Sequence, residues 1–180
     1  MYVQYFIGIV PSKEYIRKVR EFRQQWSRHS INEVVEPHIT LKAQGGLTED
    51  RRWLKKVREI CDDFEPFHLS LDQPRFFGDD ILYLSVKSQP LYLLHERMVR
   101  EISPTDEIIK SYFELDDFVP HLTLGKTTYG LTKLELQDMA KLAENELTPF
   151  PTFEVRFVRV YQEVEENQYR KYMDITLNGG

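Results

Sequence analysis

The stretch EPHITLK at residues 36–42 recurs as VPHLTLGK at residues 119–126, and this duplication decides how the rest of the chain is interpreted. In both places the extended pattern is followed, within a few residues, by a threonine that precedes a helical pattern. The two histidines lie about half a chain length apart. We therefore expect two copies of one small unit, packed face to face so that the motifs meet across a pseudo-two-fold axis.

Alternation along a strand assigns a face to each residue of the first motif. His38, Thr40 and Lys42 share one face, and Ile39 and Leu41 share the other. Each motif strand thus combines an apolar face for the core with a polar face that suits the lining of a cleft.

The same rule places His121, Thr123 and Gly125 on one face of the second motif. Gly125 is expected to leave that side of the cleft open for a substrate. Lys126 is expected on the opposite face, so it is not equivalent to Lys42.

Two facing histidines can work as an acid–base pair, because imidazole titrates near neutral pH. His38 and His121 are the predicted catalytic residues: one removes a proton from the attacking oxygen, and the other protonates the leaving oxygen. Thr40 and Thr123 are predicted to bind the phosphate, because their hydroxyls can donate to the non-bridging oxygens, which gain charge in the transition state. This scheme requires no metal and no cofactor.

The composition of the 180 residues, 41% hydrophobic and 13% aromatic, is sufficient for a buried core. The net charge of −5 argues against a protein that coats duplex nucleic acid, since such proteins present a strongly basic face. A few local cations could still hold one phosphate or a strand end. The single cysteine, Cys61, excludes an intramolecular disulfide, and no signal peptide or membrane-spanning run is recognised. We expect a cytoplasmic monomer without membrane contact.

Hydrophobic periodicity predicts one unit over residues 1–180, without a linker between domains. Strands are expected at residues 2–10, 34–43, 67–73, 80–87, 118–127, 152–163 and 169–177. Helices are expected at 13–28, 49–63, 90–102 and 132–146, with Ser12, Thr48 and Thr132 at their N-termini. Residues 74–80 and 103–115 are expected to be loops.

The chain resembles the two-histidine (2H) phosphoesterase superfamily, which includes 2′-5′ RNA ligase-like proteins and 2′,3′-cyclic nucleotide phosphodiesterases. The resemblance covers nearly the whole chain and is carried by PHITL at 37–41, the Phe76-Phe77 segment before ILYL at 81–84, and FVPHLTL at 118–124. It implies an α+β fold of two pseudo-symmetric lobes, each an antiparallel sheet with helices packed outside, around a central cleft. It also implies hydrolysis or ligation at 2′ phosphodiester linkages of RNA or a nucleotide.

Further residues are candidates for substrate contact. Phe76 and Phe77 are expected in a loop, where a ring could stack on a base, although one ring plugging the core is the simpler interpretation. Lys42 shares the polar face of the first motif. Tyr161 lies on one of the last strands and could line the cleft, but alternation alone does not say which face does so. His29, His68 and His95 have no matching partners and are expected at the surface or satisfied in the core, and Cys61 is expected to be a packed thiol.

Two alternatives to the enzyme remain open at this point. The same cleft could hold an RNA end or a nucleotide without turnover, or both motifs could be ordinary strand residues. Which histidine is the acid and which the base is not determined by the sequence, and neither is the choice between hydrolysis and ligation. The partner is expected to be an RNA end, an oligonucleotide or a small cyclic nucleotide.

Overall fold

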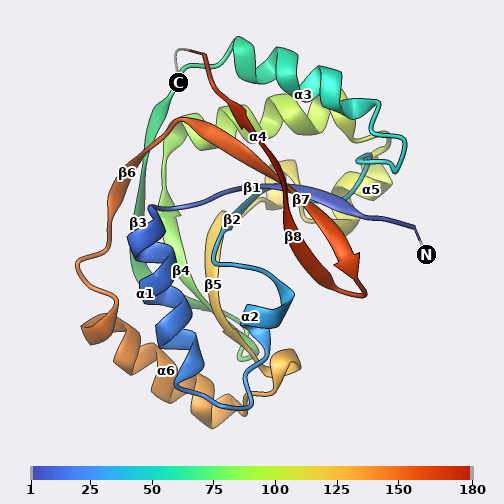
Figure 1. The fold of residues 1–180 in the computed structure, drawn as a ribbon. Coiled ribbons are helices and arrows are strands. Elements are labelled where there is room, and N and C mark those ends of the chain that lie inside the picture. The colour runs from blue at the N-terminus through green and yellow to red at the C-terminus, as the bar shows by residue number, and fades with distance from the viewer. Residues whose placement is uncertain (1, 179–180) are drawn as a thin grey trace.

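The computed structural model describes residues 2–178, which form one curled eight-stranded sheet with helices packed outside it (Figure 1). The strands are β1 (Tyr5–Ile9), β2 (Ile39–Lys42), β3 (Phe67–Phe77), β4 (Ile81–Lys87), β5 (His121–Lys126), β6 (Thr152–Val155), β7 (Phe157–Glu165) and β8 (Gln168–Thr176). The helices are α1 (Lys13–Gln24), α2 (Ile31–Val34), α3 (Trp53–Asp62), α4 (Gln89–Ile102), α5 (Asp106–Ser111) and α6 (Lys133–Glu146), with 3-10 turns η1 (Leu115–Asp117) and η2 (Thr127–Tyr129).

The order of strands in the sheet, β6-β3-β4-β5-β2-β1-β7-β8, divides it into two halves of four. Along the chain, β1-α1-β2-α3-β3 is followed by β4-α4-β5-α6 and the last strands, so the same succession occurs twice. The units exchange strands: β3 pairs with β4 of the second unit, and β7 pairs with β1 of the first. The prediction of two pseudo-symmetric lobes is confirmed.

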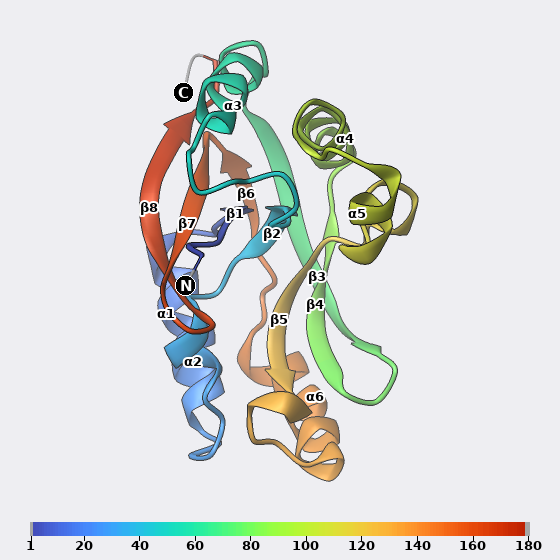
Figure 2. The same ribbon diagram turned by 90° about the vertical axis from the view of Figure 1, so that its right-hand side faces the viewer.

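The helices cover the sheet at two ends. Figure 1 shows α3 and α4 at one end of the molecule and α1 and α6 at the other, and Figure 2 shows β2 and β5 between them. Helix α4 packs against β2 and β3, and α6 packs against β3, β4 and β5. The apolar faces of the motif strands, with Ile39, Leu41, Leu122 and Leu124, belong to the main buried core.

Side-chain caps fix the starts of several helices. The hydroxyl of Ser12 accepts a hydrogen bond from the Tyr15 N–H, as its N-cap position predicted. Thr132 and Glu135 form a reciprocal capping box at the start of α6. Thr48 does not cap a helix: its hydroxyl donates to Asp50, and α3 begins later, at Trp53.

The prediction of a loop over residues 103–115 is wrong, because this segment contains helix α5. Thr105 caps the helix by accepting from the Ile108 N–H, and Asp106 and Glu107 in its first turn face the positive end of the helix dipole. The segment is short, and it carries no buried residue within α5. A hydrophobic pattern therefore could not reveal it, although the capping signal was present in the sequence.

Strand boundaries differ from the predictions at three places. Strand β3 continues through Pro74 to Phe77, so the expected loop at 74–80 shrinks to the turn before β4. Pro74 is tolerated because β6 pairs only with residues 67–70, which leaves that end of β3 at the sheet edge. The expected strand over 152–163 is divided into β6 and β7, which pair with different strands, and residues 34–38 precede β2 rather than belong to it.

Between residues 2 and 178, no helix is long and apolar enough to cross a membrane. In the same part of the chain, no group of three or more His, Cys, Asp or Glu side chains is arranged to hold a metal ion.

Candidate active site

The two motifs meet where the halves of the sheet join. Strands β2 and β5 run antiparallel, with Ile39 opposite Leu122. One position to either side, Thr40 therefore lies opposite His121, and His38 lies opposite Thr123, all four on the face away from Ile39 and Leu122. Such directly opposed side chains have Cβ atoms about 5 Å apart, and diagonal neighbours about 7 Å. The two imidazoles are thus diagonal neighbours, each beside the threonine of the other motif.

Both motif strands contain a β-bulge at the leucine that follows the threonine. Against β1, Thr40 pairs with Gly8 and Lys42 pairs with Ile7, so Leu41 has no partner residue. Against β4, Thr123 pairs with Tyr83 and Gly125 pairs with Leu82, so Leu124 is skipped in the same way. An extra residue reverses the faces of all residues beyond it. The pseudo-symmetry therefore extends to an irregularity of the backbone.

The bulges correct three predictions made from strict alternation. Lys42 does not extend the polar face: its ammonium is buried, with 0% side-chain exposure, and it pairs with the Glu114 carboxylate at 2.9 Å. A Cβ on Gly125 would lie 2.7 Å from the Met139 sulfur, so this glycine faces the core beneath α6 and leaves no opening in the cleft. Lys126 returns to the face of His121, and its charge lowers the pKa of that histidine.

Each histidine is held by the carbonyl two residues before it. His38 Nδ1 lies 2.9 Å from the Glu36 oxygen, and His121 Nδ1 lies 2.7 Å from the Val119 oxygen. A carbonyl can only accept, so Nδ1 carries the proton in both rings and Nε2 keeps a free lone pair in the neutral form. Nε2 of His38 is 3.2 Å from the Thr40 hydroxyl. Within residues 2–178, no hydrogen-bond partner is found for Nε2 of His121.

Both imidazoles are neutral in the free protein at pH 7. Burial lowers the pKa of His38 to about 4, against the opposing effect of the Glu36 carbonyl, and the charges of Arg23 and His121 lower it further. Burial also lowers the pKa of His121, again opposed by its backbone hydrogen bond. An acid–base pair formed from these rings therefore needs an additional proton, which a bound anion can stabilise.

Aromatic rings flank both histidines at matching positions. Tyr161 is buried beside His38, with ring centroids 5.4 Å apart, and Phe77 lies edge-on to His121 at 5.0 Å. Tyr161 pairs with Phe6 on β1, and Phe77 pairs with Ile81 on β4, so the two rings occupy equivalent places in the two halves. Phe76, next in the chain to Phe77, is 40% exposed and does not line the cavity described below.

Comparison with known proteins identifies the family of this chain. The family model of the 2′-5′ RNA ligase superfamily matches residues 10–167. The chain belongs to the 2′-5′ RNA ligase superfamily. A protein of Geobacillus kaustophilus assigned as a phosphoesterase is 25% identical over 183 residues, covering 98% of each chain.

Two solved structures share the fold. TT0787 of Thermus thermophilus superposes with a TM-score of 0.64 at 15% identity, covering 98% of each chain. Apo LigT of Escherichia coli superposes with a TM-score of 0.61 at 14% identity, covering 99% of each chain. The α+β fold with its two lobes is therefore that of LigT.

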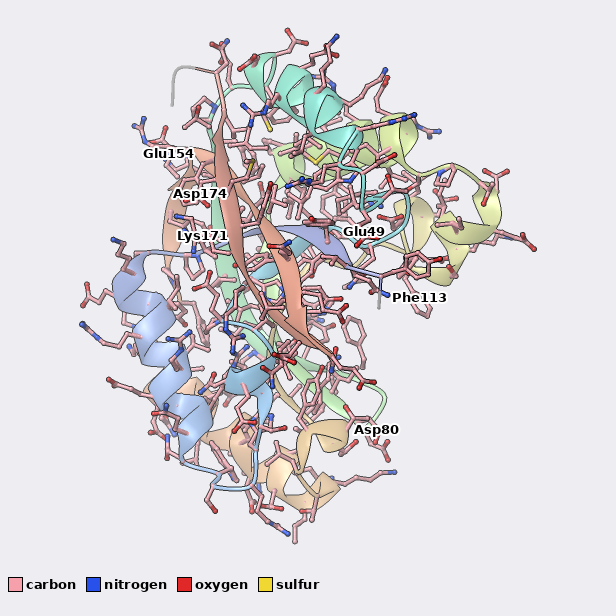
Figure 3. All side chains as sticks on the ribbon, turned by 45° about the vertical axis from the view of Figure 1, so that its right-hand side comes forward. Glu49, Asp80, Phe113, Glu154, Lys171 and Asp174 are labelled. Carbon is pink, nitrogen blue, oxygen red and sulfur yellow. The ribbon has the colours of Figure 1, made fainter. Side chains whose placement is uncertain are left out.

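An apolar cavity opens beside the second histidine of this superfamily member. It measures about 390 Å³ and is bounded mainly by aromatic and aliphatic side chains, together with Thr40 and His121. The residues that line it include Phe77, Ile81, Tyr112, Phe113, Phe118 and Val119. Phe113, in the turn that follows α5, is 70% exposed, and Figure 3 shows it at the edge of the molecule, on the same side as the β3–β4 turn marked by Asp80.

His38 is surrounded instead by a polar network. The Glu36 carboxylate accepts hydrogen bonds from Arg159 at 2.6 Å and from the Tyr161 hydroxyl at 2.8 Å. Arg159 also makes a bidentate ion pair with Asp174. Because the Glu36 carbonyl holds the His38 ring, this network fixes the histidine through the backbone. The two histidines therefore occupy different surroundings on a symmetric frame.

Sequence reasoning missed Glu114 and assigned His95 no role. Glu114 binds Lys42, the Ala43 N–H and the Ser103 hydroxyl, which attaches the segment after α5 to the end of β2. His95 donates from Nδ1 to the Leu41 carbonyl at 2.7 Å and accepts from the Leu115 N–H at 3.0 Å. Both are separated from their partners in sequence, and only the bulge that turns Lys42 inward creates the need for Glu114.

We predict that Gly125→Ala destabilises the protein by about 1–3 kcal/mol, because the added methyl group would meet the Met139 sulfur and two leucine side chains at 3.0 Å or less. Thermal or urea unfolding measures the change. A glycine that lined an open cleft would accept alanine without loss, so unchanged stability would contradict the inward orientation.

We predict that His38 titrates near pH 4 in the folded protein, observable from its imidazole NMR signals. Since the unfolded value is about 6.5, the folded state binds fewer protons below that pH. The stability due to a neutral His38 is complete above pH 6.5 and is lost as the pH falls toward 4.

Urea unfolding of the wild type and of His38→Gln checks the linkage. The free energy of unfolding of the wild type, relative to that of His38→Gln, should fall by about 1 kcal/mol from pH 7.5 to pH 5, after allowance for the partial exposure of the ring. The exposed His68→Gln serves as the control. A difference for His38→Gln that is the same at both pH values would contradict the lowered pKa.

Proposed function

We propose that the protein is a phosphoesterase that acts on a 2′,3′-cyclic phosphate or a 2′-5′ phosphodiester of RNA or a nucleotide, with His38 and His121 as the acid–base pair. The observation that carries the proposal is the arrangement at the seam, which is the contact between β2 and β5 where the two motifs meet. Two rings with the same anchored Nδ1 sit at the starts of the adjacent strands β2 and β5, His38 directly before β2 and His121 as the first residue of β5, each across from a threonine of the other motif. Membership of the 2′-5′ RNA ligase superfamily supports it.

The two histidines can carry out every proton transfer that hydrolysis of a cyclic phosphate requires. Nε2 of one histidine removes a proton from water as its oxygen bonds to phosphorus, and the second, protonated histidine gives its Nε2 proton to the departing ribose oxygen. The product is a phosphate monoester. The hydroxyls of Thr40 and Thr123 donate hydrogen bonds to the non-bridging oxygens, where charge increases in the transition state.

The proton required by the acid comes with substrate binding in this scheme. Both rings are neutral when the site is empty, and a phosphodiester anion placed between them raises the pKa of the nearer one. His121 has no protein partner for Nε2 among the described residues, and it is the ring that borders the apolar cavity. His38 is the more strongly fixed of the two.

The form of the cavity favours an uncharged organic group next to the phosphate, as a nucleobase would supply. Its lining is largely apolar, with four Phe and Tyr rings, and its charged members are the carboxylates Glu114 and Asp117, with no Lys or Arg from the described residues. A nucleobase or a short RNA end fits this better than a chain of phosphates would. E. coli LigT, which shares the fold, has been crystallised with phosphate and with 3′-AMP, and these complexes support a nucleotide ligand for the present site.

We predict that His38→Ala and His121→Ala each lower the rate of hydrolysis of a 2′,3′-cyclic nucleotide by about 10² or more. Phosphate release or product chromatography measures the rate, and exposed His68→Ala is the matched control. Full activity of purified, folded His121→Ala would refute the acid–base assignment.

A binding module that uses the same cleft without turnover is distinguished by the same assay. It would bind phosphate or a nucleotide, show no turnover of any cyclic phosphate or 2′-5′ dinucleotide, and show no bell-shaped pH profile.

We predict that Phe113→Ala raises KM for the cyclic nucleotide by about tenfold with little change in kcat, because loss of a ring that stacks on a base costs about 1–3 kcal/mol. The control is Leu134→Ala, a 69% exposed apolar residue on α6 outside the cavity. An unchanged KM for Phe113→Ala would contradict the proposal that the cavity binds the base of the substrate.

A further inference from the structure

Arg23 on α1 is a buried cation without a carboxylate partner. Its side chain is fully enclosed, at 1% exposure, whereas the other enclosed cation, Lys42, is paired with Glu114. In the described part of the chain no Asp or Glu lies within ion-pair distance of the Arg23 guanidinium. A buried charge of this kind is expensive unless something else offsets it.

The contacts of Arg23 place it directly behind the phosphate-binding residues. One terminal nitrogen donates to the Thr123 carbonyl, and the other donates to the Asn32 side-chain oxygen at 3.2 Å. Its Nε has no hydrogen-bond partner within residues 2–178. Arg23 thus reaches from α1 to the strand of the second motif, next to the seam.

The groups around the guanidinium do not neutralise it. Arg20, one turn earlier on α1, is a like charge, and Tyr129 on η2 faces the guanidinium with a phenol rather than a carboxylate. His29, after α1, is buried and neutral, with a pKa lowered to about 4 by burial and by Arg23. Burial lowers the pKa of Arg23 itself to about 9, so the side chain stays charged at pH 7.

The field of Arg23 reaches the first histidine. His38 is faced by Arg23 and His121, which lower its pKa, and by Glu36, which raises it. A fixed positive charge behind His38 and Thr123 makes the empty site favourable for an anion, and it keeps His38 available as a neutral base.

We propose that Arg23 is a positioning residue for the phosphate, and that its buried charge is offset by the phosphate group that binds between the two motifs. The proposal rests on the proposed function, since it takes the seam as the phosphate site. It requires no direct contact between guanidinium and phosphate, because a unit charge several ångströms away still acts through a partly buried site.

A purely structural role for Arg23 predicts a different behaviour. The hydrogen bond to the Thr123 carbonyl stabilises the backbone just before the bulge. If that were its only role, removal would lower stability but leave the affinity of the folded protein for phosphate and the pKa of His38 unchanged.

The test compares wild type, Arg23→Met and Arg17→Met, the last being an exposed arginine on the same helix. Calorimetry with inorganic phosphate gives Kd, thermal unfolding gives the rise of Tm with phosphate, and NMR gives the pKa of His38. We expect Arg23→Met to weaken phosphate binding about tenfold, to lose most of the rise in Tm, and to raise the pKa of His38. Arg17→Met should match the wild type in all three.

Equal phosphate affinity and an equal His38 pKa in folded Arg23→Met would overturn the inference. If that variant does not fold, Arg23→Gln replaces it and is compared with Arg23→Lys, because the amide can still donate to the Thr123 carbonyl but carries no charge. Phosphate binding about tenfold weaker in Arg23→Gln than in Arg23→Lys supports the proposal, and equal affinity of the two variants contradicts it. A loss above tenfold in folded Arg23→Lys contradicts it. A wild-type protein that binds no phosphate and turns over no cyclic nucleotide would refute the proposed function instead, and the His38 pKa would still test Arg23.

Discussion

The antiparallel contact between β2 and β5 joins the two halves of the sheet, and the position of every site residue depends on its register. Ile39 opposite Leu122 is the register pair recorded between these strands. A slip of either strand by one residue would turn the histidine of that strand into the core. The crossover helices secure the contact from both sides: α1 sends Arg23 to the Thr123 carbonyl, and α4 sends His95 to the Leu41 carbonyl. Each half thus stabilises the motif strand of the other.

The two histidines lie at equivalent positions of the pseudo-symmetric sheet, but their surroundings differ. This difference distinguishes the two ends of the cleft. Beside His38, Glu36, Arg159 and Tyr161 form a hydrogen-bonded network that holds the ring through the Glu36 carbonyl. Beside His121, the apolar cavity offers room for a substrate group. A phosphate held between the rings would have its organic substituent on the side of β5. Duplication accounts for the pair of histidines, while divergence of the surroundings accounts for a preferred orientation of the substrate.

Short-range patterns in the sequence predicted the motif strands, the two lobes and most helices, because those depend on neighbours along the chain. Alternation failed beyond Thr40 and Thr123. The bulge at Leu41 arises from the pairing of β2 with β1, and the bulge at Leu124 arises from the pairing of β5 with β4. In both cases the partner strand is distant in the sequence, and for the second motif α4 lies between the two strands. For the same reason the burial of Lys42 and its need for Glu114 could not be foreseen. Helix α5 is a different case. The sequence contained an N-terminal signal for it in Thr105, Asp106 and Glu107, but the helix has no buried face and so no hydrophobic periodicity.

The charges at the seam are compatible with the proposed proton transfer even though the free site is largely neutral. Burial alone would hold both imidazoles in the neutral form, and Arg23 adds a positive charge that lowers the pKa of His38 further. An arriving phosphate anion reverses the balance: it offsets Arg23 and stabilises a proton on a neighbouring ring. In the proposed mechanism, binding and protonation are therefore coupled, and the acid forms only when the group that it must protonate is present. In that scheme the organic part of the anion lies beside His121, because the apolar cavity borders that ring.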